Sequence, residues 1–436
     1  MTDTVRVSRD RARRRRGRSD EPADDQESAI GPDGSDGDDA SGSPTRSGRS
    51  RWGTIIFTLA TLIFIGGLGV LLWEGYNSAT EVRGGNDLDQ LSDPSQPGYQ
   101  ATVKPTQVDL VGMLTPEGTL GDVVMLVEGA GGQGGAVVLI PGVMIVESIA
   151  GPLNLETIYE TSGWEAVVDT VEQTLGVGVT GATTISTDEF QSVLATHGPL
   201  TIDNPDRIVR DAGDGNRETV FAAGQLTLSP EEVVGYVNSV SAGESEVNRA
   251  ARAQIVWEAW LAGITAQGPD ALPDVEPFGG EVGEPVDLRT LMAAMTEGFV
   301  SFEQIPLERV PVPGSDGFAV YRPQPDGINE MVIRVVPFPT AAFPGQRPRV
   351  RLLNGTTSQD RALRAASPIV AAGGEITALG NADEFGLTAT VVEYFDPAFA
   401  ETAQAIASAL GTTATQVDQA GDAFEVTVIV GSDFTG

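Results

Sequence analysis

The sequence predicts a membrane-anchored α/β protein with two folded domains beyond the membrane. Three observations lead to this fold class: a long uncharged segment near the N-terminus, a region where strand-like and helix-like runs alternate, and a C-terminal stretch with a regular βαββαβ pattern. The expected organisation is a disordered cytosolic tail at 1–51, a transmembrane helix at 52–73, a spacer at 74–105, a first domain at 106–332, a Pro-rich linker at 333–348 and a second domain at 349–436.

The segment from Trp52 to Trp73 contains no charged residue and has a tryptophan at each end. As an α-helix it would span roughly 33 Å, which matches a hydrocarbon core of about 30 Å. Its length exceeds the apolar core of a cleaved signal peptide, and tryptophan favours membrane interfaces. Arginines precede it and acidic residues dominate after it, so we expect a single-pass protein of the cell membrane with a cytosolic N-terminus and extracellular domains.

The formal net charge of −34 arises entirely after residue 51, because the tail contains equal numbers of arginines and acidic residues. Such an acidic ectodomain repels polyanions, so we expect no nucleic acid partner. The chain has no cysteine, which excludes disulfides and thiol chemistry. The tail has too few apolar residues to fold. Its basic block at 11–18 fits either contact with anionic lipids or a solvated tail that fixes topology.

The first domain begins with two strand-like runs at Val123–Val127 and Ala136–Ile140, joined by a Gly-rich segment. That segment contains GxGxxG (Gly129, Gly131, Gly134), the pattern of dinucleotide-binding loops. A dinucleotide site needs a helix next, because the helix N-terminus binds the pyrophosphate. A second strand follows instead, so we interpret the segment as a hairpin loop.

Helix signals follow along the chain. The run from Trp164 to Leu175 has helical spacing, and capping boxes begin at Ser186 and Ser229. A helix is expected over Glu246–Leu261, with Arg249 and Arg252 on one face. A single histidine, together with the absence of GxSxG, argues against a Ser-His-Asp triad.

Several of these segments together resemble the LytR-CpsA-Psr (LCP) family over about Val108 to Pro311. The segments are FAAGQLTLSPEEVVGYV at 221–237, RAARAQ at 249–254, GDVVMLV at 121–127 and LIPGVMIV at 139–146. The resemblance implies an α-β-α domain that transfers a glycopolymer from polyprenyl pyrophosphate to peptidoglycan, using Mg²⁺ and several arginines. It aligns Asp122 with the family's metal-binding Asp, and Arg249, Arg252 and Gln254 with its phosphate-binding residues.

The departures from the family pattern are more informative than the matches. Gly142-Val143 stands where the family has Arg-Asp, and Asn238 and Val240 stand where it has two arginines. Guanidinium groups bind phosphate with planar, bidentate hydrogen bonds, and the replacements carry no charge. We therefore expect a degenerate relative without phosphoryl transfer. For Arg249 and Arg252 the alternative is a solvated helix face paired with nearby acids such as Glu246.

Between these motifs and the second domain, residues 263–286 are expected to be an extended insertion and Val286–Phe302 the helical tail of the first domain. The pattern of the second domain predicts a small split-βαβ sandwich with its elements in the order βαββαβ. Pro368 predicts a kink or break in its first helix. Asn354-Gly355 and Asn381 are expected to be turn residues. These motifs, with the closing Gly431-Ser-Asp433, resemble the LytR C-terminal domain, which implies an envelope module.

Three functions remain open at this point. The first is a non-catalytic envelope protein that binds or organises wall glycopolymer, peptidoglycan or polyprenyl-phosphate lipid. The second is an active Mg²⁺-dependent phosphotransferase that uses Asp122, Arg249 and Arg252 with arginines such as Arg207 or Arg210. The third, transcriptional attenuation, is suggested only by the family's name.

Overall fold

The computed structural model describes residues 93–436, apart from 149–150, 214–215, 242–243, 246, 312–318 and 419–422. The predicted cytosolic tail, the predicted membrane span and the first part of the predicted spacer lie outside these residues. Within the described part of the chain, no helix has both the length and the apolar composition needed to cross a membrane.

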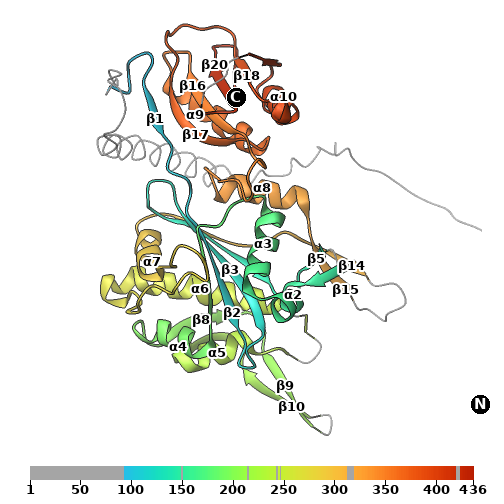
Figure 1. Cartoon of the computed structure of the whole chain (residues 1–436). Coiled ribbons are helices and arrows are strands. Elements are labelled where there is room, and N and C mark those ends of the chain that lie inside the picture. The colour runs from blue at the N-terminus through green and yellow to red at the C-terminus, as the bar shows by residue number, and fades with distance from the viewer. Residues whose placement is uncertain are drawn as a thin grey trace, which may run out of the picture. The chain divides into compact units, whose positions relative to one another are not determined.

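The first domain is built on a six-stranded sheet with the order β12-β7-β2-β3-β4-β13 (Figure 1). β7, β2, β4 and β13 run in one direction, and β3 and β12 run in the other. The strands are β2 (Val108–Leu114), β3 (Leu120–Glu128), β4 (Gly135–Pro141), β7 (Gly181–Ile185), β12 (Val282–Gly283) and β13 (Val300–Gln304).

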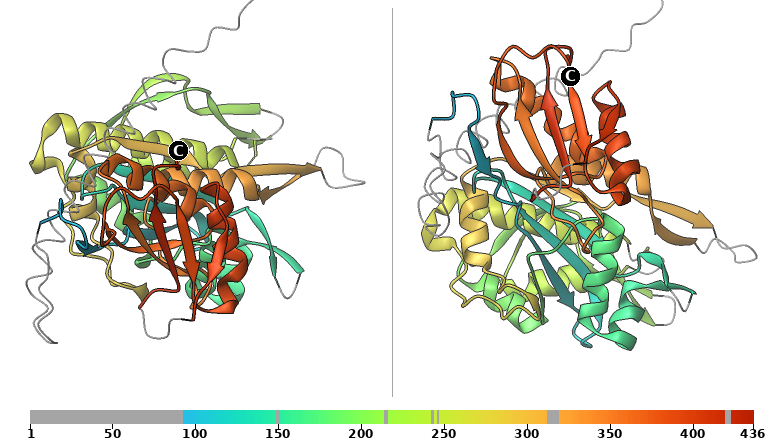
Figure 2. Two further views of the ribbon diagram at one scale, coloured as in Figure 1. Left: turned by 90° about the horizontal axis from the view of Figure 1, so that it is seen from above. Right: turned by 45° about the horizontal axis from the view of Figure 1, so that its top comes forward.

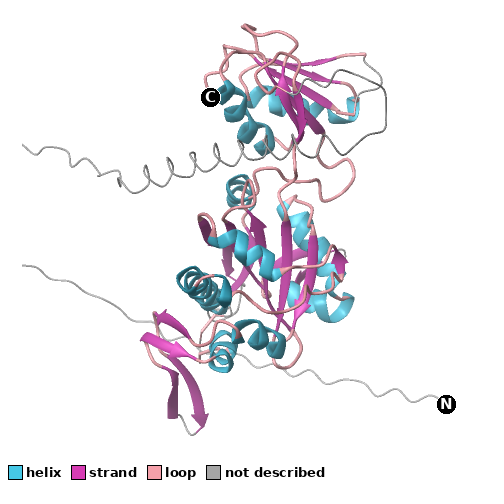
Figure 3. Ribbon diagram, turned by 90° about the vertical axis from the view of Figure 1, so that its left-hand side faces the viewer, coloured by secondary structure: helices cyan, strands magenta, loops and turns pink. Residues whose placement is uncertain are grey.

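Helices cover both faces of this sheet, as predicted for an α-β-α domain (Figure 3). One face packs on α2 (Leu155–Ser162), α3 (Trp164–Leu175) and α8 (Pro325–Val335). The other face packs on α4 (Thr187–Ala195), α5 (Pro230–Asn238), α6 (Val247–Gln267) and α7 (Leu288–Thr296).

The continuous apolar run in β3 explains the two-sided packing. Successive strand residues point to opposite faces, so a strand covered on both sides must be apolar throughout. Val123 and Met125 belong to the core under α2, α3 and α8, whereas Val124 and Leu126 belong to the core under α4 to α7. All four are fully buried.

The local signals in the first domain are confirmed. Ser186 and Ser229 each form a capping box with the glutamate three residues later. α3 ends at Gly176, which has φ 65° and therefore suits glycine. β3 and β4 pair in antiparallel register across the Gly-rich loop, so the hairpin interpretation of GxGxxG is correct.

The end of the first domain differs from the prediction. α6 continues to Gln267, six residues beyond the expected end, and part of the expected extended insertion is therefore helical. The expected helical tail contains α7 but also β13, which pairs in parallel with β4 and forms the edge of the sheet. Helical periodicity marked α7, whereas the pairing of β13 depends on a strand far away in the sequence.

Among the described residues of this domain there are also four two-stranded sheets, and one of them, β14–β15, projects from it (Figure 2). Their strands are β5 (Ile145–Ser148) with β6 (Gly151–Asn154), β8 (Leu200–Asn204) with β11 (Gly224–Leu228), β9 (Ile208–Gly213) with β10 (Asn216–Phe221), and β14 (Leu307–Pro311) with β15 (Ala319–Pro323). A short 3₁₀ helix, η1, spans Pro269–Ala271.

The C-terminal domain contains the six predicted elements in the predicted order, but its sheet is not split. β16 pairs directly with β17 in parallel, so no strand separates the two strands that α9 connects. The sheet order is β1-β17-β16-β20-β18-β19. The elements are β16 (Arg349–Asn354), α9 (Gln359–Ala371), β17 (Glu375–Asn381), β18 (Val391–Tyr394), η2 (Pro397–Phe399), α10 (Ala400–Ala409), β19 (Ala414–Gln416) and β20 (Val426–Val430).

Two further expectations for this domain are met only in part. α9 is not broken at Pro368 but continues to Ala371, because proline removes one helical hydrogen bond while the apolar side of the helix stays packed on the sheet. Asn354 does accept turn hydrogen bonds from Thr356, but Asn381 ends β17 and its side-chain amide donates to the carbonyls of Pro94 and Gln96. Residues 100–102 of the predicted spacer form the edge strand β1.

Asp109 is a buried carboxyl in β2, 1% exposed, that accepts a hydrogen bond from Gln107. Burial raises its pKa from 3.8 to about 6. A raised carboxyl pKa means that the folded chain holds the proton more tightly than the unfolded chain. Stability is therefore lost as pH rises from about 4 to about 6, by about 3 kcal/mol in total.

Asp109→Asn is expected to remove this loss, because the amide is neutral and its oxygen still accepts from Gln107. Urea unfolding at pH 8 should show a gain of up to about 3 kcal/mol over wild type, and at pH 4 almost none. An equal difference between the two proteins at both pH values would show that Asp109 does not titrate in this way.

Candidate functional site

Asp122 lies on β3 in the middle of the sheet, and it is 2% exposed. Its register partners are Met113 on β2 and Pro141 on β4. α6 places Arg249 beside it, with Nε 3.5 Å from Asp122 Oδ2. Nη2 of the same guanidinium donates to the carbonyl of Gly121 at 2.9 Å. The two residues that the resemblance assigned to metal and phosphate thus form an ion pair with each other.

Arg252 lies one turn further along α6 and is also buried, at 6% exposure. Nη1 pairs with the carboxylate of Glu244, and Nη2 donates to the carbonyl of Ser239. The alternative of a solvated helix face therefore does not describe Arg249 or Arg252. Pairing with a nearby acid does describe Arg252, and the acid is Glu244.

Gln254 does not join this group. Its side-chain amide donates to Glu258 at 2.7 Å, one turn along the outer side of α6. Arg252, Ala253, Val256 and Trp257 mark the buried side of the helix. A residue two positions after Arg252 points away from that side, because successive residues turn by about 100°.

A small pocket of about 10 Å³, with room for about one water molecule, lies beside Asp122. This volume is far below the roughly 300–1,000 Å³ typical of small-molecule sites. Asn238 lines the pocket at a position where the family has arginine, and its amide donates to the carbonyl of Val234 at 3.0 Å. The complete lining is Met113, Leu114, Gly121, Asp122, Thr187, Phe190, Val237 and Asn238.

Gly142 is the first of the replaced family positions, and the neighbouring backbone leaves no space there for a side chain. Its N–H donates to the carbonyl of Gly121 at 3.0 Å, and a Cβ at this position would lie 2.3 Å from the same oxygen. An arginine here would therefore require the backbone to move. Val240, the last of these positions, is 38% exposed. In the sequence, the departures from the family pattern at 142, 238 and 240 indicated that this site is altered. Nothing in the sequence indicated that Glu244 takes part in it.

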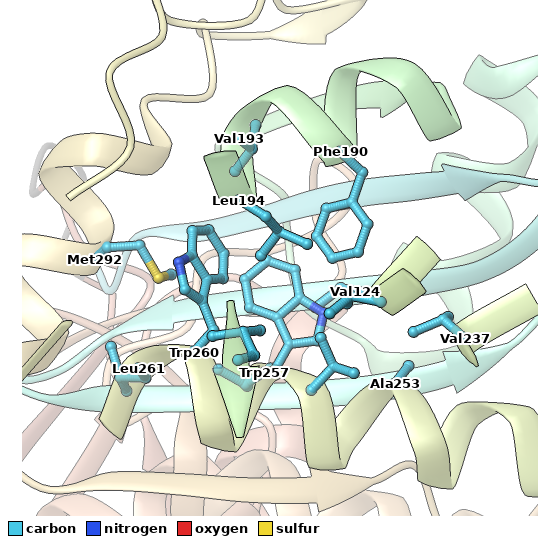
Figure 4. Close-up of a cluster of buried hydrophobic side chains, with 14 of the residues drawn as sticks. Val124, Phe190, Val193, Leu194, Val237, Ala253, Trp257, Trp260, Leu261 and Met292 are labelled. Atoms are coloured by element: carbon cyan, nitrogen blue, oxygen red, sulfur yellow. The ribbon is translucent and has the colours of Figure 1, made fainter. Parts of the chain in front are cut away.

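Aromatic side chains fill the layer between the sheet and α4, α5 and α6 (Figure 4). Trp257 and Trp260 are 2% and 0% exposed, with ring centroids 5.2 Å apart. Phe190 stacks on Trp257 at 6.2 Å. The pocket beside Asp122 therefore ends against a packed aromatic core, of which Phe190 forms part of the wall.

The lining of the pocket offers a magnesium ion one carboxylate, Asp122. Mg²⁺ usually keeps several waters and binds through one or two carboxylates together with substrate phosphates. Asp122 is one carboxylate and already pairs with a cation. No group of three or more His, Cys, Asp or Glu that could hold a metal occurs among the residues the structure describes.

Sequence models of two protein families match the chain. One is the LytR_cpsA_psr family, which matches residues 137–303. The other, LytR_C, is described as LytR cell envelope-related transcriptional attenuator and matches residues 347–434. No curated protein matches the chain by sequence.

Solved structures to which the chain is similar include TagV of B. subtilis, at 15% identity and a TM-score of 0.40, over 52% of this chain and 94% of TagV. TagT with bound octaprenyl pyrophosphate lipid is 14% identical with a TM-score of 0.38, over 58% of this chain and 95% of TagT. A LytR-Csp2A-Psr enzyme from Actinomyces oris is 17% identical with a TM-score of 0.38, over 55% of this chain and 94% of that enzyme.

The two sequence models cover most of the first domain and nearly all of the second, in the order that the motifs indicated. The chain therefore carries a domain of the LytR-CpsA-Psr family followed by a LytR C-terminal domain.

Proposed function

We propose that this chain is a non-catalytic protein of the cell envelope that binds or organises cell-wall polymer or its polyprenyl-phosphate-linked precursors. In this proposal residues 52–73 anchor it in the cell membrane, with the N-terminus in the cytosol and both domains outside. The family implies polyprenyl pyrophosphate as the first ligand to test, and TagT is a protein of this kind solved with such a lipid.

The main support for the proposal is that Arg249 and Arg252, the two arginines retained from the family pattern, are both bound by groups of this chain. Arg249 pairs with Asp122 and with the carbonyl of Gly121, and Arg252 pairs with Glu244 and the carbonyl of Ser239. A phosphoryl-transfer site needs preorganised positive charge where the transition state develops negative charge. These two guanidiniums are instead neutralised by buried carboxylates.

The pocket supports the same conclusion. Its polar lining consists of Asp122, Thr187 and Asn238 with the backbone of Gly121, and it includes no arginine or lysine. Because Arg249 neutralises Asp122, the pocket has no excess positive charge to attract a diphosphate. Its volume of about 10 Å³ also has room only for a single small group, such as one sugar hydroxyl of a wall polymer.

The test is phosphate release from polyprenyl pyrophosphate by the full chain in detergent with Mg²⁺ and peptidoglycan. We expect no release above a blank without protein. The competing hypothesis, an active phosphotransferase that uses Asp122, Arg249 and Arg252, predicts turnover that disappears in Arg249→Ala. That result, with the fold of the variant intact by circular dichroism, would refute the non-catalytic proposal.

Returning one cation to the pocket is expected to strengthen lipid binding. In Asn238→Arg the guanidinium can reach a diphosphate at the mouth of the pocket, and a hydrogen bond to a charged group contributes about 1.5–3 kcal/mol. Affinity for polyprenyl pyrophosphate should rise about tenfold or more in a fluorescence titration. Asn238→Gln is the matched neutral control, and an equal affinity of both variants would show that the lipid headgroup does not enter this pocket.

A further inference from the structure

We infer that residues 93–106 are an integral part of the C-terminal domain. The folded C-terminal unit then consists of residues 93–106 together with residues 337–436, and the first domain is an insertion between β1 and β16. The LytR_C match begins at residue 347 and does not include this strand.

Backbone hydrogen bonds hold the segment from Gly98 to Val103 against β17 and the residue that follows it. β1 (Gln100–Thr102) runs antiparallel to β17, with Gln100 opposite Gly380 and Thr102 opposite Ala378. The pairing extends past the strand, because Asn381 N–H donates to the carbonyl of Tyr99 at 2.7 Å and Val103 N–H donates to the carbonyl of Thr377 at 3.0 Å.

Side chains add contacts that a passing linker would not have. The Asn381 amide donates to the carbonyls of Pro94 and Gln96 at 2.8 and 2.7 Å. Tyr99 and Val103 are 6% and 7% exposed, and Val103 belongs to the hydrophobic core of the C-terminal domain. Without the segment, the edge of β17 would expose unpaired backbone groups and part of this core, which folded proteins avoid.

Gly380 shows that the edge of β17 is shaped for this strand. A Cβ at position 380 would lie 2.1 Å from the carbonyl oxygen of Tyr99 and 2.9 Å from two carbon atoms of Gln100. All three nearest atoms belong to residues 99 and 100. An alanine at 380 would thus clash first with the docked segment.

The two segments that connect the domains are hydrogen-bonded to each other. Thr106 N–H donates to the carbonyl of Phe338 at 2.9 Å, and Phe338 N–H donates to the Thr106 hydroxyl at 3.0 Å. Phe338 lies in the same core as Val103. Residues 106 and 338 therefore mark where the chain leaves and re-enters the C-terminal unit.

Disulfide trapping in the full chain tests the inference, because the chain has no cysteine of its own. Thr102 and Ala378 lie opposite each other as a non-hydrogen-bonded pair of the antiparallel strands β1 and β17. In such pairs the two Cα atoms are about 4.5 Å apart. We expect Thr102→Cys/Ala378→Cys to form an intramolecular disulfide under mild oxidation. Thr102→Cys/Arg351→Cys is the control. Arg351 lies on β16, on the far side of Ala378, and is therefore two strand spacings, about 9.6 Å, from Thr102, too far for a disulfide.

Gly380→Ala in the same cysteine background should slow the cross-link at least tenfold and speed amide exchange at residues 98–103. Gly279→Ala, where nothing lies near the added Cβ, should change neither. Slow exchange in β20, an inner strand of the C-terminal sheet, reports that the C-terminal domain of Gly380→Ala still folds. Equal trapping in the Thr102/Arg351 control, an unaltered rate in Gly380→Ala, or a disulfide formed only between two chains would each overturn the inference.

Discussion

Arg252→Ala is expected to lower the free energy of unfolding by about 3–5 kcal/mol, because it leaves the carboxylate of Glu244 buried without its cation. The side chains of the pair are 7% and 13% exposed, so water screens neither group well. The carbonyl of Ser239 loses its donor as well. Urea unfolding followed by circular dichroism measures the change.

Two control variants distinguish the cost of leaving a buried charge unpaired from the cost of removing an arginine. Arg210→Ala deletes an arginine that pairs with Glu218 at the surface, 69% and 58% exposed, and should cost no more than about 1 kcal/mol. Arg252→Met combined with Glu244→Leu removes both charges and should recover most of the stability. If Arg252→Ala were as stable as wild type, Arg252 would not be committed to the fold, and its role as a ligand-binding residue would be open again.

Trp260→Ala is expected to cost about 3–5 kcal/mol, because it opens a cavity in the aromatic layer between the sheet and α6. Trp260 is fully buried and contacts Trp257 in the cluster of Figure 4. Its indole N–H has no hydrogen-bond partner among the described residues. Trp260→Phe removes this unpaired donor and leaves a smaller cavity, so it should cost only about 1–2 kcal/mol.

Phe299→Ala is the matched aromatic control, since Phe299 is 52% exposed and its loss should change stability by less than about 0.5 kcal/mol. Thermal unfolding of the three variants gives the order. If Trp260→Ala unfolds at the wild-type temperature, the aromatic layer rearranges to fill the space. The pocket beside Asp122 would then not end against a rigidly packed core.

Local sequence signals predicted the elements of both domains well where a short segment contains all the information. The apolar run Val123–Val127 must be covered on both faces, and the Ser-x-x-Glu boxes satisfy their own helix N-termini. The order of strands in the C-terminal sheet could not be found in this way. A βαββαβ pattern allows β17 to pair beside β16 or to be separated from it, and nothing within either strand decides between them.

The candidate site was predicted in part for the same reason. Alignment with family motifs selected Asp122 and Arg249, because each lies on a regular element with a recognisable motif, and the structure places the two in an ion pair. Glu244 lies in a connection without periodicity, so its pairing with Arg252 had no sequence signal. The three-residue β1 lies between Gly98 and Pro105 in a segment typical of spacers, and its partner is at the opposite end of the chain.

The docking of residues 93–106 on the C-terminal sheet also has a mechanical consequence. Tension applied between the chain before residue 93 and the C-terminal domain passes through the β1–β17 hydrogen bonds. The first domain hangs as a closed loop from the Thr106–Phe338 junction and carries none of this load. Only when β1 is peeled away would the same pull stretch the first domain.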